Sequence, residues 1–378
     1  MRIELTPKQL KIQEEFRKFV EDEIIPYAGQ NDKNECIPAE LVKKVAEKGY
    51  LGSMLPKECG GMGLDSITLG LLNEEVGRGC SSVRSLLTVH GMLALAILRW
   101  GTDEQRDSLL PGLASGEIIG AFALTEPNVG SDAKSIETTA VLENGQYILN
   151  GRKKWITMGQ LADVFLVLSK CEGRPTAFIV ERNSPGFSIN PMHGLIGARA
   201  SMIAELIFDG CRIPEKNMVG RVGAGLSNVA LPCLDYGRYT IALGCVGLAQ
   251  ACLEDSVRYA RKRKQFGGPL RENQLIQKMI SGMVANIKAA RYLCYSAGYL
   301  REIGSPESIM ETWTAKYFSS VMVNKVANDA VQIHGANGLH DGYPIERYYR
   351  DARVNEIIEG TTQMHEVLIA TNAFRQYS

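Results

Sequence analysis

Residues 350–366 read RDARVNEIIEGTTQMHE and predict two helices joined by a tight turn. Apolar residues recur at helical spacing on both sides of the four residues Glu359-Gly360-Thr361-Thr362. Gly360 suits the end of the first helix, because glycine enters the left-handed backbone region without strain. Thr361 or Thr362 can then cap the second helix through its hydroxyl group.

Glu359 is the candidate general base in this turn. We expect it on the last turn of the first helix, at the negative end of the helix dipole and directly after two isoleucines. Both surroundings disfavour a charged carboxylate and should raise its pKa, as a base that works near neutral pH requires. The alternative from these residues alone is a solvated glutamate at a helix end, which is the more common situation.

The composition narrows the class of protein. The chain has 378 residues, 45% of them hydrophobic, which is enough for one large domain or two to three ordinary ones. Lys+Arg and Asp+Glu both number 42, and this zero net charge argues against binding to nucleic acid or to anionic membranes. No stretch approaches the roughly 20 uninterrupted apolar residues of a membrane-spanning helix. The N-terminal residues MRIELTPKQLKIQEEF predict a capped, charged helix that starts near Thr6, not a signal segment.

Cysteine and histidine usage points to a protein without metal or disulfides. The nine cysteines are scattered without CxxC pairs, which predicts reduced thiols in a cytoplasmic protein. The five histidines show no metal-ligand spacing, so we expect no metal ion.

Three regions of the chain differ in their hydrophobic period. The first ~120 residues have a helical period interrupted by Gly and Pro. From about residue 118 to 190, short β-branched and aromatic runs predict strands, some joined by turns such as Asn144-Gly145, and residues 204–210 add another strand. After Gly225 the pattern returns to long helices. The order predicts an α+β protein with domains at 1–118, 119–226 and 227–378.

Six ordered segments of the chain resemble those of the acyl-CoA dehydrogenase family. They are FALTEPNVGSDA (122–133), KKWITMG (153–159), YARKRKQFGGPL (259–270), QIHGANGL (332–339), YPIERYYRDAR (343–353) and IIEGTTQ (357–363). The resemblance implies the family's fold, with an N-terminal helical domain, a central β domain and a C-terminal helical bundle. It also implies FAD as cofactor and an acyl thioester as substrate.

The first two segments are expected to bind the flavin. By resemblance, the cofactor-binding residues here are Phe122, Leu124, Thr125, Gly130, Ser131, Trp155 and Thr157. Thr125 would face the flavin pyrimidine edge, Trp155 would pack against the isoalloxazine ring and Thr157 would hydrogen-bond its N5. Because Trp155 and Thr157 are two residues apart, we expect both on one face of a strand. Without the resemblance, a hydrophilic hairpin loop and a core tryptophan are the ordinary interpretations.

The remaining segments are expected to bind the diphosphate and the adenosine half of FAD. By resemblance, these residues are Arg263, Phe266, Gln274, Gln332, Gly335, Gly338, Thr361 and Gln363. The first three would reach the FAD of a neighbouring subunit, which implies a homo-oligomer. The chain departs from the family at Met158, Ala336 and Gly342, where the family often has Asn, Gly and Glu.

The resemblance also assigns the base and the substrate contacts. One subgroup takes its catalytic glutamate from an LDxxR helix, but this chain reads LDYGR at 234–238, with Gly237 in that place, so Glu359 is the expected base. The substrate-binding residues implied are Ser131, Asp235, Arg238 and Gly360.

Three strings resemble dehydrogenases of polyketide pathways, which act on small acyl groups held by an acyl carrier protein. They are GCSSVRSLLTVHGM (79–92), LDYGRYTIALGCVG (234–247) and NEIIEGTTQM (355–364). The resemblance favours hydroxymalonyl or aminomalonyl extender-unit substrates, and the alternative is a short-chain acyl-CoA. The bulky residues Leu86, Leu87, Met92 and Leu93 could shorten a pocket, but core packing is the plainer explanation.

Two further alternatives concern the electron acceptor and whether the protein is an enzyme at all. The electron acceptor is either an electron-transfer flavoprotein or oxygen. A flavin-free scaffold protein with the same fold is the least expected reading, because Glu359, Trp155, Thr157 and Arg263 are all present.

Overall fold

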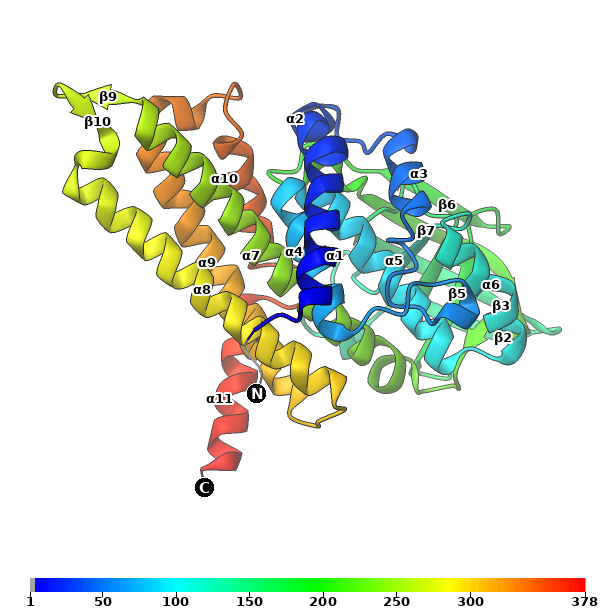
Figure 1. Ribbon diagram of the computed structural model, residues 1–378. Coiled ribbons are helices and arrows are strands. Elements are labelled where there is room, and N and C mark those ends of the chain that lie inside the picture. The colour runs from blue at the N-terminus through cyan, green and yellow to red at the C-terminus, as the bar shows by residue number, and fades with distance from the viewer. Residues whose placement is uncertain (1–3, 378) are drawn as a thin grey trace.

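The computed structural model describes residues 4–377 and divides into an N-terminal set of helices, a central sheet and a C-terminal set of helices (Figure 1). This arrangement confirms the predicted α+β fold class. The N-terminal helices are α1 (Pro7–Phe19), α2 (Ile25–Asn34), α3 (Ala39–Glu47), α4 (Ser66–Gly79), α5 (Ser81–Trp100) and α6 (Asp103–Ser115). The predicted cap at Thr6 is confirmed: its hydroxyl accepts from the Gln9 N–H, and the Gln9 side chain accepts from the Thr6 N–H.

The central region is a mixed sheet with the strand order β6-β7-β3-β2-β4-β5-β8, and β1 pairs with β4. Its strands are β1 (Gly120–Ala123), β2 (Thr139–Glu143), β3 (Gln146–Ile156), β4 (Val164–Cys171), β5 (Arg174–Glu181), β6 (Phe187–Pro191), β7 (Ala204–Pro214) and β8 (Met218–Val219). The β1–β4 and β2–β4 pairs are parallel, and the other pairs are antiparallel. Asn144 and Gly145 both have positive φ and form the predicted two-residue hairpin between β2 and β3.

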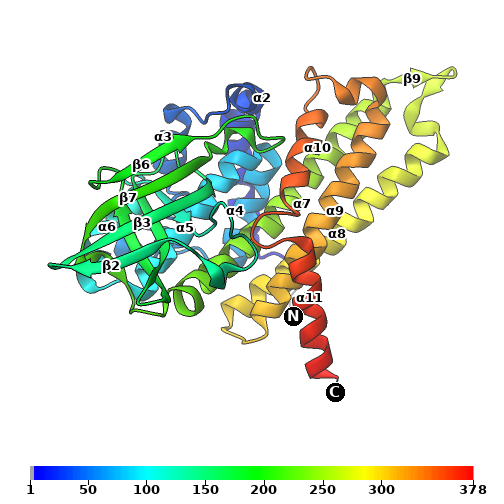
Figure 2. The same cartoon turned by 180° about the vertical axis from the view of Figure 1, so that it is seen from behind.

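The C-terminal region is built on three long helices. It contains α7 (Leu231–Lys262), β9 (Lys264–Gln265), β10 (Gly268–Pro269), α8 (Gln274–Glu302), α9 (Ser308–His334), α10 (Ile345–Val354) and α11 (Thr362–Gln376). Helices α7, α8 and α9 extend away from the sheet to the small β9–β10 hairpin, and α11 projects below this bundle at the C-terminus (Figures 1 and 2). Helix α7 also packs against α4 and α5, so it joins the two helical regions.

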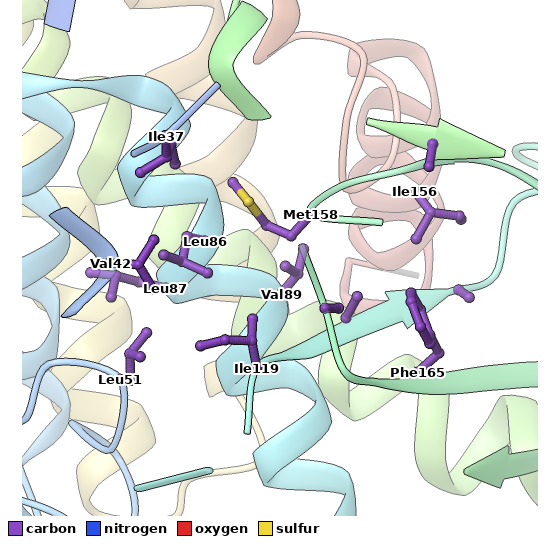
Figure 3. Close-up of a cluster of buried hydrophobic side chains, with 14 of the residues drawn as sticks. Ile37, Val42, Leu51, Leu86, Leu87, Val89, Ile119, Ile156, Met158 and Phe165 are labelled. Carbon is purple, nitrogen blue, oxygen red and sulfur yellow. The ribbon is translucent and has the colours of Figure 1, made fainter. Parts of the chain in front are cut away.

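Helix α5 lies in the core between the N-terminal helices and the sheet. Its Leu86 and Leu87 are buried in a hydrophobic cluster that also contains Val42 and Met158 (Figure 3). Met92 and Leu93 are buried in a neighbouring cluster with strand residues. These bulky side chains therefore contribute to ordinary core packing. By length and composition, Ser81–Trp100 and Gly225–Lys262 pass as membrane-crossing helices, but 94% and 72% of their most apolar windows are buried within the protein, as in core helices.

Polar contacts dock helix α10 onto the other two regions. Arg350 donates to both carboxylate oxygens of Asp32 on α2, at 3.3 and 2.6 Å, and to the carbonyl of Ile196 at 3.1 Å. Asp351 accepts from the backbone N–H of Ala198 at 2.6 Å. A Cβ at Gly197 would lie 2.2 Å from the Arg350 carbonyl, so only glycine permits this close approach. These contacts fix the helix that leads directly to Glu359.

Candidate active site

Glu359 lies in a turn between two helices. Helix α10 ends at Val354, so the expectation that Glu359 is on its last turn is wrong. Residues 355–361, which we call the Glu359 loop, leave the helix as irregular turns, and both Glu359 and Gly360 have positive φ, 54° and 94°. A left-handed backbone is strained for glutamate and therefore needs support from the surrounding structure.

Two buried cations provide that support by binding consecutive carbonyl groups of the loop. Arg238 on α7 donates from Nε to the Glu359 carbonyl at 3.0 Å. Lys316 on α9 donates from Nζ to the Gly360 carbonyl at 2.7 Å. Thr361, one of the two predicted caps, accepts from the Met364 N–H at 3.3 Å and so caps α11. The Glu359 loop is thus held at both carbonyls and at its exit.

The Glu359 carboxylate points at Gly237 of α7. Its Oε2 atom is buried and accepts no hydrogen bond among residues 4–377. A Cβ at position 237 would lie only 2.6 Å from that oxygen, so the glycine leaves the space that the carboxylate occupies. Burial raises the pKa of Glu359 to about 7, although Arg238, Lys316 and Arg84 oppose the rise. The predicted rise in pKa is confirmed, but its cause is burial against α7, not a position at a helix end.

Asp235 and Arg238 serve the Glu359 loop in this structure. Oδ1 of Asp235 accepts from Arg238 Nη1 at 2.6 Å and from the Trp313 indole N–H at 2.7 Å. The Arg238 guanidinium lies 5.2 Å from the centre of the Trp313 ring. We expected both side chains to bind substrate. In this structure their hydrogen bonds go to Trp313 and to the loop, so both side chains position the loop, and their contact with substrate remains a prediction.

A buried ion pair fixes the loop that follows β1. Lys153 on β3 donates to Glu126 at 2.6 Å and to the Leu124 carbonyl at 2.9 Å, and both charged side chains are buried. Glu126 also accepts from the Thr138 N–H at 3.0 Å. Burial lowers the pKa of Lys153 to about 8 in spite of its acidic partner. We did not predict this pair, although both residues lie in the quoted segments.

Trp155 and Thr157 lie at an irregular end of β3. The register of β3 against β7 shifts between Lys153 and Ile156, Trp155 has φ 62°, and the strand ends before Thr157. The simple alternation that we expected for this pair is therefore wrong, because a bulge intervenes. The Trp155 side chain is 52% exposed and presents a flat aromatic surface.

The first group of predicted cofactor residues fits a flavin. The Thr125 carbonyl accepts from the Lys154 N–H at 2.8 Å, which ties the loop to the strand that carries Trp155. The side chains of Phe122 and Leu124 are buried in a hydrophobic core cluster. Gly130 and Ser131 are exposed, and a Cβ at Gly130 would meet no atom within 4 Å. An exposed aromatic ring beside a rigid loop with open backbone is suited to a flat, phosphate-bearing cofactor.

The second group lies at the far end of the helical bundle and near α11. Arg263, Phe266 and Gln274 are exposed at the β9–β10 hairpin, and Phe266 has φ 53° with its ring fully in solvent. Gln332 and Gly335 at the end of α9 and Gln363 on α11 are also exposed, whereas Gly338 is buried and Thr361 is half-buried. Along α7, Gly237 and Arg263 are 26 residues apart, roughly 39 Å. The hairpin therefore does not reach the Glu359 loop of its own chain.

A cavity of about 520 Å³ between α2, α7 and α10 contains none of the predicted site residues. Its walls include the ion pairs that dock Arg350 onto Asp32 and Glu346, so these charges are used within the fold. Within residues 4–377, no three His, Cys, Asp or Glu side chains gather in a way that could hold a metal ion.

Comparison with known proteins identifies the family. Models of the acyl-CoA dehydrogenase N-terminal, middle and C-terminal domains match residues 6–117, 121–211 and 223–374. The chain is 40% identical to an acyl-CoA dehydrogenase of Bacillus subtilis, and the match covers 97% of this chain and 98% of that protein. It is 36% identical to the short-chain specific acyl-CoA dehydrogenase of Clostridium acetobutylicum over 99% of this chain and 100% of that protein.

Solved structures agree with this result. A chain in the structure described as "Electron transferring flavoprotein of Acidaminococcus fermentans" matches with a TM-score of 0.96 and 37% identity over 99% of this chain and 100% of that chain. The prolyl acyl carrier protein oxidase AnaB matches with a TM-score of 0.93 and 29% identity, over 98% of this chain and 100% of that chain. FkbI matches with a TM-score of 0.88 and 31% identity, over 96% of this chain and 99% of that chain. That protein is described as acting in biosynthesis of the methoxymalonyl extender unit of a polyketide. The chain therefore belongs to the acyl-CoA dehydrogenase family, whose members are FAD-dependent oxidoreductases that act on acyl thioesters.

Proposed function

We propose that this enzyme oxidises a small acyl group held as a thioester on an acyl carrier protein, with Glu359 as the general base. The observation that carries the base assignment is the Glu359 carboxylate itself. Its Oε2 is buried without a hydrogen-bond partner, and its pKa of about 7 allows it to accept a proton near neutral pH. Arg238 and Lys316 fix the loop, so the carboxylate keeps its direction when a proton arrives.

The chain's own groups divide the work of the reaction. The Glu359 N–H donates to no acceptor among the described residues, which leaves it free for the thioester carbonyl oxygen and makes the α-proton more acidic. Glu359 then removes the α-proton, a hydride leaves the β-carbon, and the product is an enoyl thioester. When bound, FAD supplies the two-electron acceptor for that hydride. With an extender-unit substrate, Glu359 would instead take the proton of an aldehyde hydrate as the hydride leaves the same carbon, which gives a carboxylic acid.

Two likenesses support a carrier-bound substrate. The overall structure resembles both AnaB, a prolyl acyl carrier protein oxidase, and FkbI, which is described for an extender-unit pathway. The segments 79–92 and 234–247 resemble enzymes of that kind, and they form the α5–α7 contact beside Glu359. The second candidate is a short-chain acyl-CoA dehydrogenase, which the 36% identity to the Clostridium enzyme favours.

We further propose that the enzyme is a homo-oligomer in which the β9–β10 hairpin completes the FAD site of another subunit. The exposed Arg263 and Phe266 lie too far along α7 to serve their own Glu359 loop. The electron acceptor remains a prediction between an electron-transfer flavoprotein and oxygen, and the likeness to the Acidaminococcus structure favours the former. A cytoplasmic location also remains a prediction.

Rapid anaerobic mixing tests the carrier proposal. The holoenzyme is mixed with one small acyl group on carrier protein, on CoA and on pantetheine, and bleaching of the flavin is followed. We expect the highest kcat/KM with the carrier protein, and added salt should slow that reaction selectively, because carrier proteins are acidic and are steered by opposite charge. The pantetheine thioester is the control that lacks both the adenosine and the protein. Comparable or faster turnover with butyryl-CoA would contradict the proposal and support the short-chain acyl-CoA alternative.

A further inference from the structure

Helix α10 begins at the wall of the cavity of about 520 Å³ between α2, α7 and α10. Its N-cap residue is Pro344, which has no side-chain group that could accept from the first turn. The backbone N–H groups of Ile345, Glu346 and Arg347 donate to no acceptor among residues 4–377. Free N–H groups and the positive end of the helix dipole attract an anion. Because water can meet this need at an ordinary helix end, a ligand site requires a further group that binds anions.

Arg347 is such a group, because it is a buried cation of the cavity wall without a hydrogen-bond partner. The residue is 6% exposed, and among residues 4–377 its guanidinium donates no hydrogen bond and has no carboxylate within 4.0 Å. It lies 5.1 Å from the centre of the neighbouring Tyr348 ring. Burial opposes its charge, but Tyr348 and the more distant Asp351 raise the pKa of Arg347 and keep it protonated. Buried charges normally have a hydrogen-bonded partner, so Arg347 is open to an anion that the chain does not supply.

The other charged side chains of the cavity wall are all used in ion pairs. These pairs are Lys33–Asp341 at 2.7 Å, Arg78–Glu254 at 3.6 Å, Arg199–Glu35 at 2.8 Å, Arg258–Asp255 at 2.5 Å, Arg350–Asp32 at 2.6 Å and Arg350–Glu346 at 2.7 Å. Every carboxylate of the wall therefore has a cation within 4.0 Å. Among the described wall residues, the one charge without such a partner is Arg347, and it lies in the first turn of α10.

We propose that this cavity binds a phosphate group at the N-terminus of α10, with the Arg347 guanidinium and the free N–H groups of residues 345–347 as its donors. The planar fork of a guanidinium suits two phosphate oxygens, and the tetrahedral group has further oxygens for the backbone. A cavity of about 520 Å³ is in the range of small-molecule sites and exceeds the size of a phosphate ion. The phosphate can therefore be free or belong to a small ester such as a nucleotide.

This site is separate from the base and does not depend on the proposed function. Glu254 on the cavity wall is 17 residues from Gly237 along α7, roughly 26 Å. None of the predicted cofactor or substrate residues lines the cavity. Failure of the phosphate proposal would thus leave the acyl-thioester assignment unchanged.

Two measurements on the FAD-loaded enzyme test the proposal, because bound FAD excludes the probes from the cofactor site. Titration calorimetry in a buffer without phosphate compares inorganic phosphate, AMP and adenosine, and adenosine is the control without a phosphate group. We expect saturable binding of phosphate and AMP but not of adenosine. Hydrogen exchange of the amides at 345–347 should slow when either phosphate probe is bound, because these N–H groups are the proposed donors.

Arg347→Met should weaken the binding of both phosphate probes by about 10–100-fold, the range for one charge-assisted contact, and Arg347→Lys should keep part of it. Arg258→Met is the matched control, because it removes a cation of the same wall that is exposed and paired with Asp255. It should change the affinity by less than about fivefold, the range of a surface charge.

The proposal is overturned if neither phosphate nor AMP binds, if adenosine binds as tightly as AMP, or if binding leaves exchange at 345–347 unchanged. Undiminished affinity in Arg347→Met would also overturn it. If Arg347→Met does not fold, the calorimetry and the hydrogen exchange of the unaltered enzyme still decide. Within a positive result, tighter binding of AMP than of phosphate assigns the site to a phosphate ester, and equal affinity assigns it to the free ion.

Discussion

The Glu359 loop and the β9–β10 hairpin carry the two predicted kinds of chemistry and are built in opposite ways. In the loop, Arg238 and Lys316 bind consecutive carbonyl groups, and Gly237 leaves space for the carboxylate. In the hairpin, Phe266 is fully exposed in a left-handed conformation and the charged residues around it are exposed. The difference teaches that a single chain supplies all the contacts that position the base. The exposed hairpin residues, in contrast, can contact a ligand or another subunit only outside their own chain.

Glu359→Gln should have the largest effect on the reaction rate, because it removes the proton acceptor from the Glu359 loop. The amide retains the shape of the side chain, so the protein should fold and bind FAD. Flavin reduction by substrate should fall by about 10²–10⁴-fold or more. Stopped-flow absorbance measures the reduction rate. Glu366→Gln, at an exposed position on α11 seven residues later, is the control and should keep a nearly normal rate. Substantial reduction in Glu359→Gln would point to another carboxylate.

Arg263→Ala tests whether the β9–β10 hairpin binds the FAD of another subunit. If its guanidinium binds the FAD diphosphate of another subunit, the substitution should weaken FAD by about 10–100-fold and loosen the oligomer at the same time. Flavin content and sedimentation velocity are measured on the same samples. Arg261→Ala, two residues earlier and equally exposed, should change neither. Flavin loss with an unaltered oligomer would place Arg263 in the site of its own subunit.

Thr361→Ala should have the smallest effect, a loss of stability where the Glu359 loop leads into α11. It removes the hydroxyl that accepts from the Met364 N–H, and loss of such a cap costs about 1 kcal/mol of stability. Chemical denaturation of the holoenzyme measures the change. Thr371→Ala in the middle of α11 is the matched control, because its hydroxyl only bonds back to the Val367 carbonyl. An equal loss in both variants would mean that the cap does not hold the loop.

Features that depend on residues close together in the sequence were predicted correctly. The order of helical and strand regions, the Thr6 cap, the Asn144-Gly145 hairpin and the raised pKa of Glu359 followed from spacing and residue type, and the structure confirms them. The resemblance extended this to the family and to FAD. The assignments of individual cofactor residues remain predictions.

What the sequence did not predict depends on contacts between distant segments. The end of α10 at Val354 and the left-handed Glu359 depend on cations from α7 and α9, which no local pattern brings together. The bulge at Trp155 arises from pairing with β7 and interrupts the alternation that its neighbours suggest. Arg84 reads as an ordinary helical arginine, and only the packing of α5 against α7 makes it a buried cation beside the base.

The pH dependence of flavin reduction tests the central claim most directly, that burial against α7 makes Glu359 a base near neutral pH. At limiting substrate, kcat/KM reports the free enzyme, and only the ionised carboxylate can accept the proton. Because burial raises the pKa of Glu359 to about 7, the rate should rise about tenfold per pH unit below that value and level off above it. In Glu359→Gln this rise should be absent. A rate that is constant from about pH 5.5 to 8.5, or one that rises with a midpoint near the ordinary glutamate pKa of about 4.3, would contradict the account.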